Sequence, residues 1–183
     1  MTPRDAFGGL IAVLEGARIA YMLVGSFASS YHGVPRATQD IDLVVDPTEP
    51  QLRVLIRSLP EDRYYADIEA ALDALRRRTM FNILDMATGW KVDLIVRKDR
   101  PFSREEFSRR MPVEFQGRTL FIASAEDVVL SKLEWARAAR SRRQLEDVAS
   151  VLKVRAVTLD LSYIENWVLA LHLENEWAAA RAV

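Results

Sequence analysis

Residues 21–46 read YMLVGSFASSYHGVPRATQDIDLVVD, and this stretch decides the expected fold. It opens in a short apolar run over residues 19–24, which is typical of a buried strand and ends in a turn at Gly25-Ser26. A short helix is expected over residues 27–32 and a second strand over residues 39–45. Alternation of strand and helix at this scale predicts an α/β domain.

The second expected strand carries two carboxylates, Asp40 and Asp42. Side chains on a strand alternate between its two faces, so residues two positions apart emerge on the same side. Two like charges at this spacing repel each other unless a cation lies between them. Carboxylate oxygens suit Mg²⁺, which commonly combines one or two of them with waters and substrate phosphates. The pair therefore predicts a magnesium site.

A third carboxylate, Asp93, lies within residues 90–96, WKVDLIV, another candidate strand. Three carboxylates from adjacent strands can hold two metal ions about 3.5–4 Å apart, the arrangement used for in-line displacement at phosphorus. One ion would activate an acceptor hydroxyl, and the other would hold the triphosphate and the leaving pyrophosphate.

Gly25-Ser26 suits the phosphate end of such a site. Glycine lets the backbone approach phosphate oxygens closely, and a helix N-terminus offers free N–H groups and a positive dipole. The Ser26 hydroxyl adds a donor, and Arg36 and Thr38 could reach the nucleotide or the acceptor. Each feature alone has a plainer explanation, since Gly-Ser often marks only a turn and a lone Asp-x-Asp is common on strands. Their order and spacing are more specific than any one of them.

Outside this stretch, apolar periodicity and capping residues predict a series of further elements. Ser103 and Ser124 are expected to cap helices, and the last helices should form an all-helical part beyond an α/β part. The expected domains are residues 1–122 and residues 123–183, packed together without a flexible linker. The expected helices cover residues 6–18, 48–59, 67–75, 104–110, 125–139, 142–152 and 161–177, and the expected strands cover residues 79–86, 91–96, 113–115 and 119–122.

In this order the motifs resemble the nucleotidyltransferase superfamily typified by DNA polymerase β, in its minimal bacterial form. The matching residues are Gly25-Ser26, then Arg36-x-Thr38-x-Asp40-Ile41-Asp42-Leu43, then Val92-Asp93-Leu94-Ile95. Within the superfamily the chain is most similar to the AbiEii-type branch, which includes toxins of type IV toxin–antitoxin systems. The similarity to this branch rests on Lys132 in one helical segment and Asp147 after an arginine-rich segment, and the whole resemblance covers residues 20–150.

The resemblance implies a small mixed sheet flanked by helices, with a C-terminal helical bundle. It also implies a nucleoside triphosphate (NTP) donor and two Mg²⁺ or Mn²⁺ ions. Asp40 and Asp42 would ligate both ions, and Asp93 would assist the base that activates the acceptor.

The remaining roles implied by the resemblance concern the nucleotide. Gly25 and Ser26 would bind the triphosphate, Lys132 would reach the nucleotide, and Asp147 would orient that lysine or a nearby arginine. From its place in the sequence alone, Lys132 could equally be a solvated helix lysine. The usual Arg-Asp before the last motif's final Asp is absent, because Leu145-Glu146 stand there.

Composition narrows the class of protein and its partners. The 183 residues are 50% hydrophobic and 28% charged, a mixture typical of globular proteins, and contain no cysteine, which excludes disulfides and thiolate metal sites. No apolar run approaches the roughly 18 residues that span a bilayer, and no signal peptide is recognisable, so a cytoplasmic location without membrane contact is expected. The net charge of −1 does not indicate a nucleic-acid binder, although local arginine clusters keep RNA open as an acceptor.

Several alternatives stay open at this point. The acceptor could be RNA, a protein or a small molecule such as an aminoglycoside. The chain could instead be a non-catalytic relative that binds another protein, such as an antitoxin, and its apolar C-terminal helices could form a homodimer. His32 could contact the nucleotide, whereas His172 is expected to be structural. Helical tryptophans at positions 135, 167 and 177 are expected to anchor a core or an interface.

Overall fold

The computed structural model describes residues 3–38, 40–115 and 117–183, with side chains from residue 8 onward. Gln39, which was expected in a strand, and Gln116, which stands between two expected strands, lie outside the described residues. Contacts divide the chain into two compact units. Unit 1 comprises Met1–Leu23 and Thr38–Phe107, and unit 2 comprises Val24–Ala37 and Ser108–Val183. The expected mixed α/β class is confirmed.

Unit 1 contains a mixed sheet with the strand order β3-β4-β5-β2-β1. The central strands β2 and β5 are parallel, whereas the other neighbouring pairs are antiparallel. Strand β3 was not expected, because two residues are too short to show a periodicity. The strands are β1 (Tyr21–Leu23), β2 (Asp40–Val45), β3 (Tyr64–Tyr65), β4 (Met80–Asp85) and β5 (Trp90–Val96).

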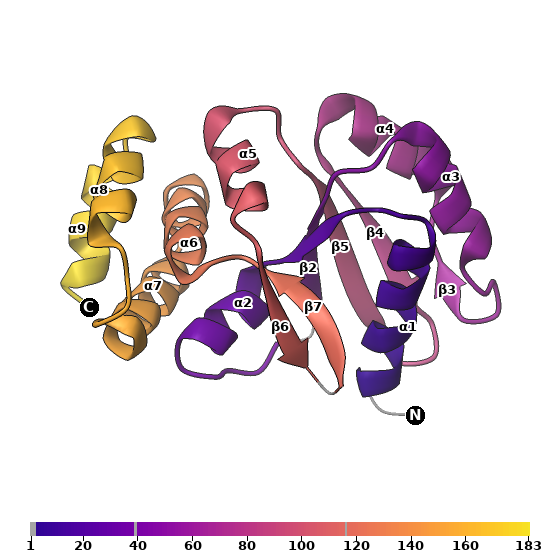
Figure 1. Cartoon of the computed structure of the whole chain (residues 1–183), viewed down its shortest axis with the longest axis horizontal. Helices are drawn as coiled ribbons and strands as arrows, with labels where there is room; N and C mark the ends of the chain where they lie inside the picture. Colours follow the sequence, from indigo (N-terminus) through magenta and orange to yellow (C-terminus); the bar gives the residue numbers. More distant parts are fainter. Residues whose placement is uncertain (1–2, 39, 116) are drawn as a thin grey trace. The chain divides into compact units, whose positions relative to one another are not determined.

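Two helices of unit 1 begin at capping residues. Thr48 and Gln51 form a capping box at α3, and the Asp67 side chain accepts backbone N–H groups at α4. The Ser103 prediction is wrong, because α5 begins at Pro101, a residue favoured in the first helical turn, and Ser103 is buried inside the helix. The helices are α1 (Pro3–Gly16), α3 (Glu49–Ser58), α4 (Ile68–Arg77) and α5 (Pro101–Ser108), the last of which ends in unit 2 (Figure 1).

Unit 2 combines the helix that follows β1 with the C-terminal helices. The Ser124 side chain accepts the Asp127 N–H, so α6 begins where the capping signature predicts. The segment after α2 is held on α7, since the Val34 N–H donates to Ser150 Oγ at 2.7 Å. A Cβ on Gly33 would lie 2.6 Å from the same oxygen, so this approach requires glycine. The elements are α2 (Gly25–His32), β6 (Met111–Phe115), β7 (Arg118–Ile122), α6 (Ala125–Ala139), α7 (Arg142–Arg155), α8 (Leu161–Ala170) and α9 (Glu174–Arg181) (Figure 1).

The prediction of a single last helix over residues 161–177 is wrong, because this segment forms two helices. His172 has a φ of 56°, a left-handed conformation that ends α8 before α9 begins. Arg137 donates to the carbonyl oxygens of Leu171 and His172 at 2.8 and 3.0 Å, which satisfies acceptors at this break. Trp177 is buried as expected, but Trp135 is 57% exposed and anchors no core.

The compact units do not follow the predicted division at residue 122, because residues 24–37 and the β6–β7 hairpin belong with the C-terminal helices. Division into domains at that residue stays a prediction. Among the described residues, no helix is both long enough and apolar enough to cross a membrane.

Candidate functional site

Strands β2 and β5 of unit 1 bring the predicted carboxylates next to each other. The register pairs Asp42 with Asp93 and Asp40 with Lys91. Neighbouring strands lie about 4.8 Å apart, and residues paired in this way point to the same face of a sheet. Ile41 occupies the opposite face, where it is buried. We call Asp40, Asp42, Lys91 and Asp93 the acidic face.

Asp93 already has partners for both carboxylate oxygens. Its Oδ2 lies 3.1 Å from Lys91 Nζ, and its Oδ1 accepts a hydrogen bond from the Asn82 amide. Asp93 is 7% exposed, whereas the Lys91 side chain is 43% exposed. The hydrogen bond to Asp93 raises the pKa of Lys91, and the negative charges of Asp93, Asp40 and Asp42 act in the same direction. The ammonium group therefore lies within electrostatic reach of all three carboxylates.

The acidic face suits a divalent cation in its donor chemistry. All three carboxylates offer oxygen ligands, and an existing positive charge lies against Asp93. Within residues 3–38, 40–115 and 117–183, however, no three histidine, cysteine, aspartate or glutamate side chains converge as a metal-binding group. The register nevertheless places the three carboxylates on one face of two paired strands.

Unit 2 brings together four other predicted residues, of which Asp147 is the central one. Arg36 forms a fork on it, with Nε 2.9 Å from Oδ1 and Nη2 2.9 Å from Oδ2. Lys132 Nζ lies 2.7 Å from Oδ2, so the expected contact between the lysine and Asp147 is present. Arg36 Nη2 also donates to Ser26 Oγ at 2.7 Å. We call Ser26, Arg36, Lys132 and Asp147 the Asp147 cluster.

Burial and charge act against each other at Asp147. Burial alone would raise the pKa of its carboxyl, but hydrogen bonds from Arg36 and Lys132 bring that pKa below its ordinary value. The hydrogen bond between Arg36 and Asp147 also raises the pKa of Arg36. Lys132 is only 5% exposed, which excludes the alternative of a solvated helix lysine.

The two remaining predicted residues lie at the ends of elements. Gly25 begins α2 with a φ of 62°, a left-handed conformation in which glycine is favoured. The Val24 cap makes no side-chain hydrogen bond to the N-terminus of α2. The Thr38 hydroxyl, in unit 1, contacts the backbone of Asp40, with its Oγ1 3.2 Å from the Asp40 carbonyl oxygen. Thr38 thus shapes the chain at the start of β2.

His32 is buried at 2% exposure, and its Nε2 lies 2.8 Å from the Ala123 carbonyl oxygen. A carbonyl only accepts, so Nε2 carries the proton, and Nδ1 has no hydrogen-bond partner among the described residues. Burial lowers the pKa of His32, and the nearby Arg155 adds to this effect. These contacts give His32 a structural position in unit 2.

Two members of the site were missed by sequence reasoning. Lys91 could have been found, because it stands two positions before Asp93 and so shares its face. Asn82 carried no such signal, since its contact with Asp93 depends on the antiparallel register of β4 and β5.

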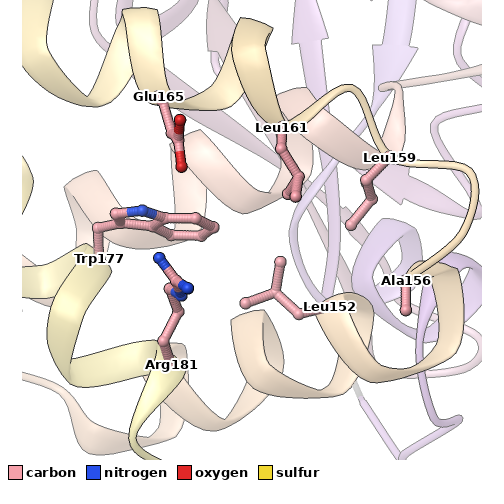
Figure 2. Close-up of a pocket in the computed structure, with 7 residues that line it drawn as sticks. All are labelled: Leu152, Ala156, Leu159, Leu161, Glu165, Trp177 and Arg181. Atoms are coloured by element: carbon pink, nitrogen blue, oxygen red, sulfur yellow. The ribbon is translucent and has the colours of Figure 1, made fainter.

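A small hollow of about 190 Å³ in unit 2 contains none of the predicted site residues. Figure 2 shows the Trp177 indole and the Arg181 guanidinium on one side of this hollow, with the Glu165 carboxylate above them. Leucines from α7, α8 and the segment between them make up much of the remaining wall. It lacks the group of carboxylates that a phosphoryl-transfer site needs.

Comparison with known proteins places the fold. No protein-family model matches the sequence, and no curated protein matches it. Solved structures do match, and the fold they share with this chain is that of the nucleotidyltransferases. With 14% identity, the chain is similar to ANT(2'')-Ia in complex with adenylyl-2''-tobramycin, over 100% of this chain and 98% of that one, at a TM-score of 0.55.

Two further structures show the same fold. The lincosamide antibiotic adenylyltransferase LnuA, bound to lincomycin, is 11% identical over 84% of this chain and 98% of its own, at a TM-score of 0.55. An antigenic nucleotidyltransferase-like protein from Paracoccidioides brasiliensis is 16% identical over 91% of this chain and 88% of its own, at a TM-score of 0.53.

Proposed function

We propose that this protein is a metal-dependent nucleotidyltransferase, which transfers a nucleoside monophosphate group from an NTP to an acceptor hydroxyl. The observation that carries the proposal is the register of β2 and β5, which pairs Asp42 with Asp93 in a nucleotidyltransferase fold. An accidental Asp-x-Asp would have no reason to lie beside a third carboxylate on the neighbouring strand.

Asp40, Asp42 and Asp93 are the residues that would hold two Mg²⁺ or Mn²⁺ ions. When bound, such ions supply charge neutralisation at the phosphates and lower the pKa of an attacking hydroxyl. Asp93 is the most buried of the three carboxylates. Its place beside Asp42 suits a group that accepts the hydroxyl proton or assists the base that does so.

The Asp147 cluster and Gly25 would bind the nucleotide. The N-terminus of α2 points its backbone N–H groups and its positive dipole outward from Gly25 and Ser26, an arrangement that suits phosphate oxygens. Arg36 donates a hydrogen bond to the Ser26 hydroxyl at that same helix start. The hydroxyl is therefore positioned before the nucleotide arrives. Three residues of the sequence separate Arg36 of the cluster from Asp40 of the acidic face.

The proposed reaction is a single displacement at phosphorus. The acceptor oxygen forms a bond to the α-phosphorus while the bond between that phosphorus and the bridging oxygen of the β-phosphate breaks. Pyrophosphate leaves with the bonding electrons, and the hydroxyl proton passes toward Asp93. Positioning and charge stabilisation account for most of the catalysis in reactions of this kind.

For the acceptor, we propose testing small molecules first. Two of the similar structures are the antibiotic-resistance factor ANT(2'')-Ia with adenylyl-2''-tobramycin and the lincosamide antibiotic adenylyltransferase LnuA with lincomycin. RNA and protein hydroxyls are the other two classes. A place in the AbiEii-type branch, a toxin role and a cognate antitoxin remain parts of the proposal that rest on the sequence resemblance alone.

The experiment that tests the proposal measures transfer from each of four α-³²P-labelled NTPs to a panel of aminoglycosides, lincosamides, total RNA and total protein, with Mg²⁺. We expect one NTP to label one acceptor class. The Asp42→Asn variant should lose at least about a thousandfold in rate, because losing a metal ligand removes several kcal/mol of transition-state stabilisation.

A matched control is Asp73→Asn, a change of the same kind at a residue of α4 whose side chain is 47% exposed, which should retain the wild-type rate. A fully active Asp42→Asn variant would overturn the metal assignment. Absence of both transfer and Mg-NTP binding would favour the alternative, a non-catalytic protein that acts by binding a partner.

A further inference from the structure

We infer that Lys91 is a built-in counterion of the acidic face, which occupies the Asp93 carboxylate until a divalent metal ion takes its place. This inference rests on the proposed function, since it concerns metal loading of the same carboxylates. It assigns to Lys91 a role in setting metal affinity, a role separate from ligating the metal or contacting the substrate.

The position of Lys91 follows from strand geometry. It stands opposite Asp40 in the parallel pair and two residues before Asp93, so it shares the face of all the carboxylates. Its Nζ lies 3.1 Å from Asp93 Oδ2, the distance of a direct ion pair. A single positive charge thus stands on the face that carries the carboxylates of two strands.

Charge explains why this contact matters for metal binding. A divalent ion and an ammonium group at neighbouring positions repel each other, so an ion that reaches Asp93 must displace Lys91. Asn82 would not have to leave, because it is neutral and holds the other oxygen. The contact therefore lowers metal affinity by the free energy of the Lys91–Asp93 pair.

The exposure of Lys91 indicates that moving its ammonium group away from Asp93 costs little free energy. The Lys91 side chain is 43% exposed and the Asp93 side chain 10%, so the ammonium group can move into solvent while the carboxylate stays in place. Partly exposed ion pairs are weak. Lys91 should consequently tune the metal affinity without preventing metal binding.

The test measures Mn²⁺ binding without nucleotide, by the electron paramagnetic resonance signal of free Mn²⁺, so that the readout is independent of activity. We expect Lys91→Met to lower the Kd for Mn²⁺ about three- to tenfold. Lys91→Arg, which keeps the charge, should stay near the wild-type value. Lys98→Met removes the same charge from an exposed position just after β5 and should leave the Kd unchanged.

The outcomes separate this inference from the proposed function. If Lys91→Met binds Mn²⁺ no more tightly than Lys98→Met while Asp42→Asn loses binding, the Lys91 role is overturned and the metal site stands. If Asp42→Asn binds Mn²⁺ like the wild type, the metal site itself is overturned, and the Lys91 role with it. Lys91→Gln provides a second neutral variant should Lys91→Met fail to fold.

Discussion

The acidic face of unit 1 and the Asp147 cluster of unit 2 are built from the same kinds of charged group in opposite proportions. On the acidic face, three carboxylates surround one partly exposed ammonium group. In the Asp147 cluster, two cations share one carboxylate, and both Lys132 and Asp147 are buried. The first region has an excess of formal negative charge, and the second an excess of formal positive charge.

This difference indicates what each region lacks. Carboxylates that outnumber their counterions are completed by an added cation, whereas a cationic cluster beside a helix N-terminus is completed by an anion. Under the proposed function, Mg²⁺ would complete the first region and the phosphates of an NTP the second. The Asp147 cluster is also closed by short internal contacts, so it should contribute to folding stability, while the acidic face should contribute little until an ion binds.

The largest expected effect is a loss of folding stability at the buried Asp147 cluster. Asp147→Asn should lower the free energy of unfolding by about 3 kcal/mol, because it removes the buried negative charge that Lys132 and Arg36 share. Asp42→Asn, the same chemical change on the acidic face, should alter it by less than about 1 kcal/mol, since like charges surround that position. Urea denaturation without metal measures both.

A surface pair sets the scale for this experiment. Glu49 and Arg53 form an exposed ion pair on α3, and Glu49→Ala should cost no more than about 0.5 kcal/mol. Equal losses for Asp147→Asn and Asp42→Asn would contradict the distinction between the two regions.

The second prediction concerns removal of the metal. If Mg²⁺ binds with a Kd of roughly 1 mM, raising it from zero to 10 mM should stabilise the wild type by about 1.4 kcal/mol. A thermal or urea titration with Mg²⁺, and its reversal by EDTA, measures this gain. Asp42→Asn should not respond, whereas Asp147→Asn should start less stable and still respond. A Mg²⁺ response that is lost in Asp147→Asn but kept in Asp42→Asn would contradict the prediction, because it would place the ion at the Asp147 cluster and away from the acidic face.

The smallest predicted effect is a pH dependence confined to unit 2. The pKa of His32 lies below its ordinary value of 6.5, so the unfolded chain takes up the proton first as the pH falls. Stability that is fully present above pH 6.5 should therefore decline below it, by at most about 1.4 kcal/mol at pH 5.5 for one group.

Comparison with a neutral variant isolates this contribution. His32→Gln does not titrate, so its unfolding free energy should be flatter than that of the wild type between pH 6.5 and 5.5, as urea denaturation at each pH would show. Glu126 raises the pKa of His32 and Arg155 lowers it, so these two charged groups have to be kept in both proteins. If the unfolding free energies of the two proteins changed in parallel with pH, His32 would be excluded as the cause of the pH dependence.

Most elements could be predicted from the sequence because their signals are local. The Ser124 cap and the apolar spacing after it predict α6 at residues 125–139, where it is found. The split between α8 and α9 was missed, since nothing in residues 161–177 interrupts a helical pattern and the break depends on a left-handed His172. Ser103 was misassigned because serine is a common capping residue, whereas the helix already begins two residues earlier at Pro101.

What the sequence determined by itself is the chemistry that each short segment offers. Alternation along a strand places Asp40 and Asp42 on one face, and Gly25 with Ser26 opens a helix after a buried strand; both follow from contacts within a few residues. Only the tertiary structure decided the partners. The pairing of Asp42 with Asp93 depends on the register of two strands, and the fork of Arg36 on Asp147 joins residues 111 positions apart. Periodicity specifies the face on which a side chain lies, whereas the packing of the whole chain selects the residue opposite it.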